Sequence, residues 1–145
     1  MTASIDSIVE GFPFPTVLPI VGEPNYESIA ALNQQLNANA ASVQSHLGNG
    51  VLGLLALTVS PAVYTTLSQV AFVPPANPGP VAIIPVGATA GRIVNIRDEF
   101  RDRTELFKRY NNTDKALKKL LLGAVDDMLT RVLKKQIHSI ANTFV

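Results

Sequence analysis

One stretch decides the fold: residues 25–48, which read NYESIAALNQQLNANAASVQSHLG. Its apolar side chains recur every three or four positions, which is the spacing of one face of an α-helix. They are Ile29, Leu32, Leu36, Ala40, Val43 and Leu47. Asn25 is a good helix N-cap, and Gly48 is a natural left-handed stop. The stretch therefore predicts a helix with one buried face.

The opposite face of this helix is polar but carries no charge. Its members are Asn33, Gln34, Asn37, Ala41 and Gln44. Water-facing protein surfaces normally mix charges of both signs. A face solvated mainly by amides suits a contact between identical subunits, because like charges that meet across a symmetric contact repel each other. These five residues form the candidate assembly face.

Charge is divided unevenly along the chain, whose net charge is +1. No charged side chain lies between Glu27 and Arg92. Residues 1–91 hold four acids and no base, whereas residues 92–145 hold all 12 lysines and arginines and seven acids. Any attraction to nucleic acid would therefore act at the C-terminal end. The candidate basic face consists of Lys115, Lys118, Lys119, Arg131, Lys134 and Lys135. No aromatic residues interleave with these bases, which favours an ordinary solvated helix face.

The N-terminal segment, residues 1–24, is predicted to be an extended arm. Four prolines from Pro13 onwards prevent a regular helix and push the preceding residues to extended geometry. The apolar side chains of the arm are expected to lie across a groove of the folded body. They are Ile8, Val9, Phe12, Phe14, Val17, Leu18 and Ile20.

A second proline-rich segment, residues 72–87, is predicted to be a long exposed loop of polyproline II and turns. A loop of this length is usually functional or mobile. It suits either a flexible connector or a docking segment for a proline-reading partner. The candidate exposed residues of this loop are Pro78, Gly79 and Pro80.

The remaining segments are also helical in pattern. Ser60-Pro61 is a serine cap with proline at the first helical position, which predicts a helix over 61–70. Its buried side is expected to be Val63, Leu67 and Val70. Residues 51–59 fit either a buried extended segment or a short helix.

The last third of the chain predicts three more helices. The first runs from Thr89 to Tyr110, the second is capped by Thr113, and the third is capped by Asp126. With the helices before them, they predict an all-α fold. Its parts are an extended arm over residues 1–24 and a helical domain over residues 25–145.

No catalytic or metal-binding arrangement is recognisable. The absence of cysteine excludes disulfides, zinc ribbons and thiol chemistry. His46 and His138 have no acidic residue at metal-ligand spacing, so both are expected to be structural or surface residues. Asp126 and Asp127 point apart on a helix, and capping explains Asp126 better than acid–base catalysis. The chain is therefore expected to be no enzyme and to bind no cofactor.

The N-terminus does not resemble a signal peptide, because Asp6 and Glu10 interrupt its apolar residues. The longest strongly apolar stretch, residues 51–59, is too short to span a bilayer. A cytoplasmic protein without a membrane partner is expected.

Four blocks of the sequence resemble the Gag polyprotein of copia-type LTR retrotransposons. The first is GEPNYESIAALNQQLNANAASVQSHLG, residues 22–48. The second covers residues 54–64 with the core VSPAVY, and the third is FVPPANPG, residues 72–79. The fourth is DKALKKLLLGAVD, residues 114–126. The chain departs from the pattern near residues 48–55, where relatives are richer in glycine and histidine.

The resemblance implies a capsid-like helical bundle, the N-terminal capsid lobe, with no catalytic role. Such a domain associates with copies of itself into cytoplasmic virus-like particles. Element RNA would be bound through regions outside this chain, because no Cys-His knuckle is present. Two other classes fit the residues alone: a helical adaptor that binds a protein through its neutral groove, and a weakly RNA-binding helical domain.

Overall fold

The computed structural model describes the backbone of residues 3–20, 23 and 25–143, and their side chains as far as Val125. It contains α1 (Ile5–Glu10), α2 (Tyr26–Ser42), the 3-10 helix η1 (Leu55–Leu57), α3 (Pro61–Ser68) and α4 (Ala90–Thr143). No strand occurs among the described residues. The prediction of an all-α fold is confirmed.

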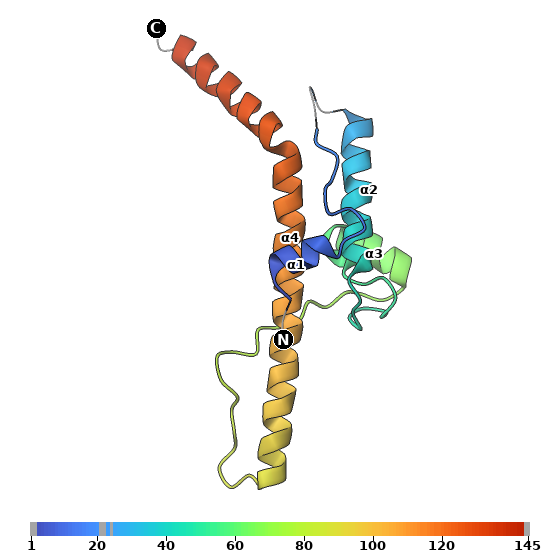
Figure 1. Ribbon diagram of the computed structural model, residues 1–145, viewed down its shortest axis with the longest axis vertical. Coiled ribbons are helices and arrows are strands. Elements are labelled where there is room, and N and C mark those ends of the chain that lie inside the picture. Colours follow the sequence, from blue (N-terminus) through green and yellow to red (C-terminus); the bar gives the residue numbers. More distant parts are fainter. Residues whose placement is uncertain (1–2, 21–22, 24, 144–145) are drawn as a thin grey trace.

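The long helix α4 is the axis of the molecule (Figure 1). Helices α1 and α2 both pack against it, and α3 is joined to α2 through η1. The first turns of α4 extend away from this body, with the loop between α3 and α4 beside them (Figure 1). The core therefore lies beside the middle of α4 and leaves its N-terminal part largely uncovered.

Helix α2 begins where the sequence predicts. The Asn25 side chain accepts a hydrogen bond from the Ser28 N–H at 2.8 Å, and the Ser28 hydroxyl accepts one from the Asn25 N–H at 3.1 Å. The helix ends at Ser42, so the prediction that it continues to residue 47 is wrong. The chain turns back instead, and the Leu54 N–H donates to the Ala40 carbonyl at 3.0 Å. This bond occupies a carbonyl near the C-terminal end of the helix.

The N-terminal arm supplies three of the ten buried residues of the main core. Phe12, Val17 and Ile20 are buried, together with residues of α2 and α4. Those residues are Leu32, Leu36, Ala40, Ala116, Leu117, Ala124 and Val125. Phe14 and Leu18 remain exposed. The groove prediction is thus confirmed for Phe12, Val17 and Ile20 but not for Phe14 and Leu18.

The prediction that prolines keep the whole arm extended is wrong for α1. Ser4 caps this helix by accepting a hydrogen bond from the Ser7 N–H at 3.1 Å. The helix ends at Glu10, before the first proline of the arm. Proline restricts its own residue and the one before it, so residues 5–10 are free to be helical.

Residues 51–59 form turns around η1, which favours the short-helix interpretation. Helix α3 then starts at the predicted cap, where the Ser60 hydroxyl accepts from the Val63 N–H at 3.2 Å. Its predicted buried side is wrong. Val63, Leu67 and Val70 are exposed, whereas Tyr64 and Ser68 are buried. The ring of Tyr64 is fully buried and packs edge-on against Phe72, at 5.3 Å between centroids, so this side of the helix faces the body.

The three helices predicted after residue 89 are one continuous helix, α4. Thr113 does not act as a cap, because its hydroxyl donates to the Arg109 carbonyl of the preceding turn at 2.8 Å. The Asn112 side chain donates to the Ala3 carbonyl at 3.1 Å and so holds the start of the arm. Asp126 lies within the helical backbone rather than at a helix start. The residues that the sequence suggested as a helix end and a helix cap thus have other partners: Thr113 bonds to the preceding turn of the helix, and Asn112 bonds to the arm.

Candidate interaction surface

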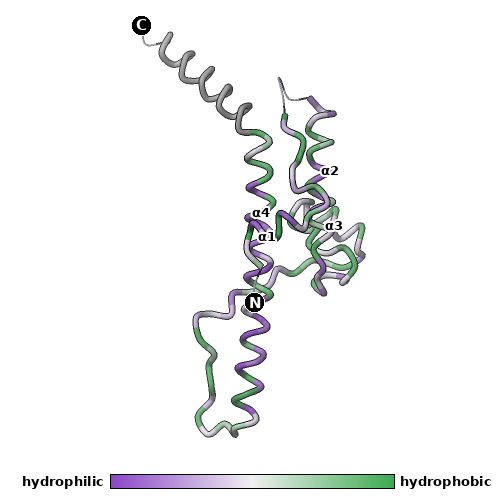
Figure 2. The backbone as a smooth tube through the Cα atoms, in the orientation of Figure 1, coloured by the Kyte–Doolittle hydropathy of each residue, from purple (hydrophilic) through white to green (hydrophobic). Residues whose placement is uncertain are grey.

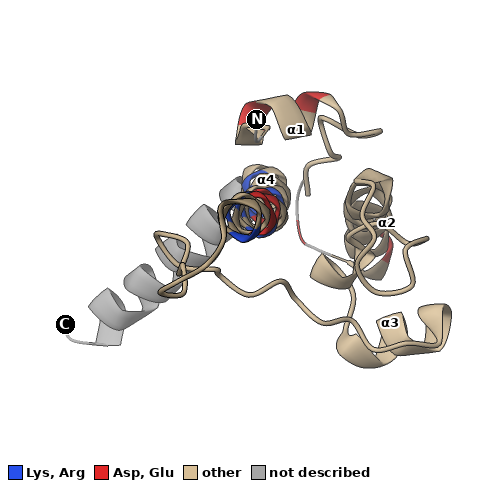
Figure 3. Cartoon of the chain, turned by 90° about the horizontal axis from the view of Figure 1, so that it is seen from below, with Lys and Arg blue, Asp and Glu red and all other residues tan. Residues whose placement is uncertain are grey.

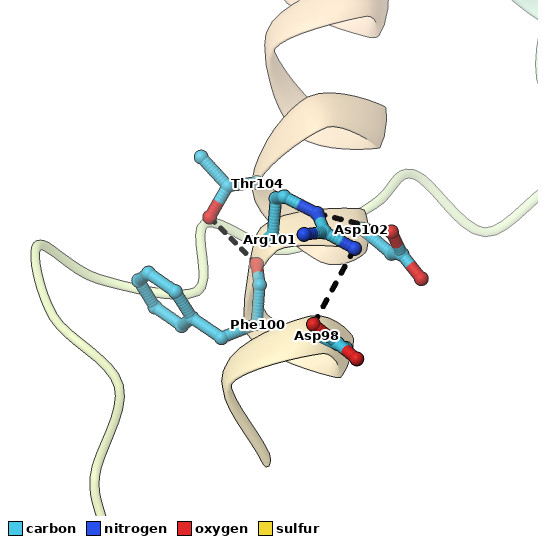
Figure 4. Close-up of polar contacts among 5 residues, drawn as sticks. All are labelled: Asp98, Phe100, Arg101, Asp102 and Thr104. Atoms are coloured by element: carbon cyan, nitrogen blue, oxygen red, sulfur yellow. Dashed lines mark hydrogen bonds and ion pairs between the residues drawn. The ribbon is translucent and has the colours of Figure 1, made fainter. Parts of the chain in front are cut away.

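Charged residues are concentrated on α1 and α4, whereas α3 and the segments around it contain none (Figure 3). The first turns of α4 mix charges of both signs, and Arg101 lies close to two acids. Arg101 lies 3.5 Å from Asp98 and 3.9 Å from Asp102, and all three are largely exposed (Figure 4). The Thr104 hydroxyl, on another side of this helix, donates to the Phe100 carbonyl at 2.8 Å. This end of α4 is an ordinary solvated surface.

The candidate assembly face is accessible on α2. Asn33, Gln34, Ala41 and Gln44 are exposed, and Asn37 is half-buried. Asn33 borders a small apolar hollow between α2 and α4 that also includes Leu57 and Leu121. Ala41 and Gln44 border a wider cleft at the other end of the helix. Four of the five residues are therefore exposed, but Asn37 is half-buried, and Gln44 lies beyond the end of α2, where helical spacing no longer applies.

Exposed apolar residues lie further along the uncharged part of the chain, on α3 and in the loop after it. On α3 and just after it they are Val63, Leu67, Val70 and Val73, and in the loop they are Val81, Ile83 and Val86. Figure 2 shows hydrophobic stretches along the loop beside a largely hydrophilic part of α4. Large apolar patches on a surface usually mark a contact with another molecule.

The predicted loop is irregular throughout, in agreement with the sequence. Gly79 and Pro80 are exposed, and Pro78 is half-buried. The Gly79 N–H donates to the Asn77 side chain at 2.9 Å, and its φ of 92° is one that glycine adopts readily. The loop tip is thus a turn that stands clear of the body.

The candidate basic face is partly neutralised. Lys115 is exposed, Lys118 contacts Asp114 at 2.8 Å, and Lys119 contacts Asp6 of α1 at 3.0 Å. The hydrogen bond to Asp114 raises the pKa of Lys118. The side chains of Arg131, Lys134 and Lys135 lie outside the described residues. Two of the three described lysines therefore hold acidic partners rather than standing free for phosphates.

Two amide side chains of α2 have a role that the sequence did not reveal. The Asn39 side chain accepts from the Phe14 N–H and donates to the Phe14 carbonyl, both at 2.9 Å. The Gln35 side chain accepts from the Leu18 N–H at 2.8 Å. Their spacing of four residues puts both amides on one side of the helix. The pair binds the arm through its backbone, as a neighbouring strand would.

A cleft of about 570 Å³ lies between the end of α2, the turn at 44–54 and α4. Its wall includes His46, Arg109 and Tyr110. Burial, and secondarily Asp114, raise the pKa of Tyr110, and its ring stacks on Phe72 at 6.1 Å. Among the described residues, no group of three histidine or acidic side chains could hold a metal ion. The side chains around the cleft therefore do not indicate a catalytic or metal-binding site.

None of the described helices is both long enough and apolar enough to cross a membrane. Comparison of the chain with models of known families, with curated proteins and with solved structures finds no match. Function must therefore be inferred from the surface just described and from the resemblance of the sequence blocks.

Proposed function

We propose that this chain is a structural subunit that assembles with copies of itself, as a Gag-like capsid domain of a copia-type retrotransposon. The observation that carries the proposal is the uncharged and partly apolar surface over α2, α3 and the loop. Residues 28–91 contain no charged side chain, yet much of this region is exposed. Identical subunits can meet through such a surface without like-charge repulsion.

The resemblance of the four sequence blocks supports a capsid subunit over other self-associating proteins. The alternative of an RNA-binding helical domain is less well supported, because no aromatic residue interleaves with the bases between Lys115 and Lys135. A shell requires many weak contacts, and multivalency turns them into a stable assembly. Virus-like particles in the cytoplasm remain part of this proposal.

Sedimentation over a range of protein concentrations, with electron microscopy of the largest species, tests the proposal. We expect growth into rings, sheets or shells. A chain that stays monomeric at high concentration would contradict the proposal and favour the adaptor. RNA binding that weakens steeply with salt would favour the nucleic-acid-binding alternative.

Gln34→Glu provides a sharper version of the test. It places one negative charge on the candidate assembly face at an exposed position, so we expect weaker self-association and unchanged folding. Arg103→Gln is the matched control. It changes the net charge by the same amount on the exposed, charged part of α4. If both variants assemble alike, the α2 face is not an assembly surface.

A further inference from the structure

The groove between α2 and α4 recognises a short pattern in the arm. Val17 and Ile20 are buried in it, with 7% and 4% of their surfaces exposed. The Leu18 N–H donates to Gln35 at 2.8 Å, and the Ile20 N–H donates to the Ala124 carbonyl at 2.9 Å. Proline, which has no N–H, stands between these two donors at position 19. The groove therefore takes two apolar side chains three positions apart and two N–H groups on either side of a proline.

The same pattern occurs a second time, in the loop before α4. Residues 83–86 read Ile-Ile-Pro-Val, against Val-Leu-Pro-Ile at 17–20. Aligned on the proline, Ile83 and Val86 correspond to the two side chains that the groove buries. They are among the most exposed apolar side chains of the described chain, at 88% and 106%. Within the described residues, the N–H groups of Ile84 and Val86 donate no hydrogen bond.

The loop cannot reach this groove in its own chain. Ala124 lies about 51 Å along α4 from Ala90, at a rise of about 1.5 Å per residue. Val86 precedes Ala90 by four residues, which span at most about 14 Å when fully extended. The loop lies beside the N-terminal end of α4, whereas the arm lies beside a part of α4 further along the helix (Figure 1). Only the groove of another copy is accessible to it.

We propose that residues 83–86 of one copy bind the groove of a second copy in place of residues 17–20. This inference rests on the proposed function and names one of its contacts. The two segments do not correspond further towards the N-terminus. In the same alignment Pro80 corresponds to Phe14, and proline has no N–H to donate to Asn39. The arm therefore stays held at Phe14 while its second half is displaced. The arm belongs to the same chain as the groove, so it competes strongly with the loop of another copy. Each loop–groove contact is therefore weak, and only an assembly of many copies makes these contacts stable.

Full-chain variants test this exchange. Ile83→Asp combined with Val86→Asp removes both anchors, and because these side chains are exposed we expect unchanged folding. Self-association should weaken at least about tenfold, a change that sedimentation resolves. The matched control is Arg97→Gln combined with Arg103→Gln, which lowers the net charge by the same two units at exposed positions of α4 outside the uncharged surface. If the wild-type chain assembles and the two double variants behave alike, this inference is wrong and the proposed function stands.

A synthetic peptide of residues 81–88 tests the groove directly. Added to the isotope-labelled full chain, it should shift the NMR signals of Gln35, Leu18 and Ile20 but leave that of Phe14 in place. The same peptide with aspartate at positions 83 and 86 is the control and should shift none of them. Ile20→Ala in the arm should increase the affinity for the peptide, because the competitor is weakened.

Absence of these shifts at millimolar peptide, or a lower affinity for the peptide in Ile20→Ala, would overturn the inference. A wild-type chain that never self-associates would instead contradict the proposed function. In that case the peptide experiment alone decides whether the groove recognises the segment.

Discussion

Removing the Asn39 side chain should loosen the arm from the body. The side chain is fully buried and makes two hydrogen bonds of 2.9 Å to the backbone of Phe14. Each such bond contributes about 1 kcal/mol net, and more when its partner stays buried. Alanine gains up to about 0.7 kcal/mol of helix propensity at this position, which offsets part of the loss. We expect Asn39→Ala to lower the free energy of unfolding by about 2 kcal/mol.

Urea denaturation followed by circular dichroism gives that free energy, and amide hydrogen exchange at Phe14 reports release of the arm. Asn33→Ala is the matched control, because it makes the same change at an exposed position of the same helix. It should leave stability unchanged or raise it by up to about 0.7 kcal/mol. Equal stability in the two variants would refute the reasoning that Asn39 holds the arm.

Asn39→Asp separates the two hydrogen bonds. An ionised carboxylate still accepts from the Phe14 N–H but cannot donate to the Phe14 carbonyl. Burial raises the pKa of this carboxyl in the folded state above its unfolded value of about 3.9. The variant should therefore lie closest to the wild type below pH 4 and lose stability as the pH rises through the folded pKa. A constant difference from the wild type across this range would contradict the donor role.

Three further substitutions test the packing. Tyr64→Phe removes a buried hydroxyl without a partner among the described residues, so thermal unfolding should show equal or higher stability, by about 1 kcal/mol; a clear loss would mean that the hydroxyl is bonded. Gly53→Ala should destabilise by at least about 2 kcal/mol in urea, because its φ is 56° and a methyl group would overlap the carbonyls of Ala41, in the last turn of α2, and Val43, the C-cap. Lys119→Ala should change the free energy of unfolding by less than about 0.5 kcal/mol, because both partners of its ion pair are exposed. A larger loss would mean that α1 depends on this pair.

Local signals in the sequence predicted the starts of helices well. Asn25 and Ser60 cap α2 and α3 as expected, because a side chain that accepts from an N–H three residues ahead needs no distant partner. The same type of signal failed at Thr113. A threonine hydroxyl can also bond back to a carbonyl inside a helix, and the two choices have the same local sequence. Which one holds depends on whether the helix continues, and that is decided by packing.

Helical spacing correctly predicted exposed positions for Asn33, Gln34 and Ala41, whereas Asn37 is half-buried and Gln44 lies beyond the helix. Gln35 and Asn39 were missed. They belong to the same amide-rich stretch, and nothing local distinguishes an amide that faces water from one that binds an extended segment. Their partners, Leu18 and Phe14, lie 17 and 25 residues away.

The sequence alone was enough to predict the helical class, the starts of α2 and α3, the irregular loop and the absence of charge in the middle of the chain. These properties depend on side-chain chemistry and on neighbours within one or two turns. The tertiary structure alone decided that α4 is continuous, that Tyr64 rather than Val63 faces inward, and that the arm lies between α2 and α4. Those outcomes depend on which distant surfaces meet, because burial and hydrogen bonding are shared between segments that the order of residues does not place together.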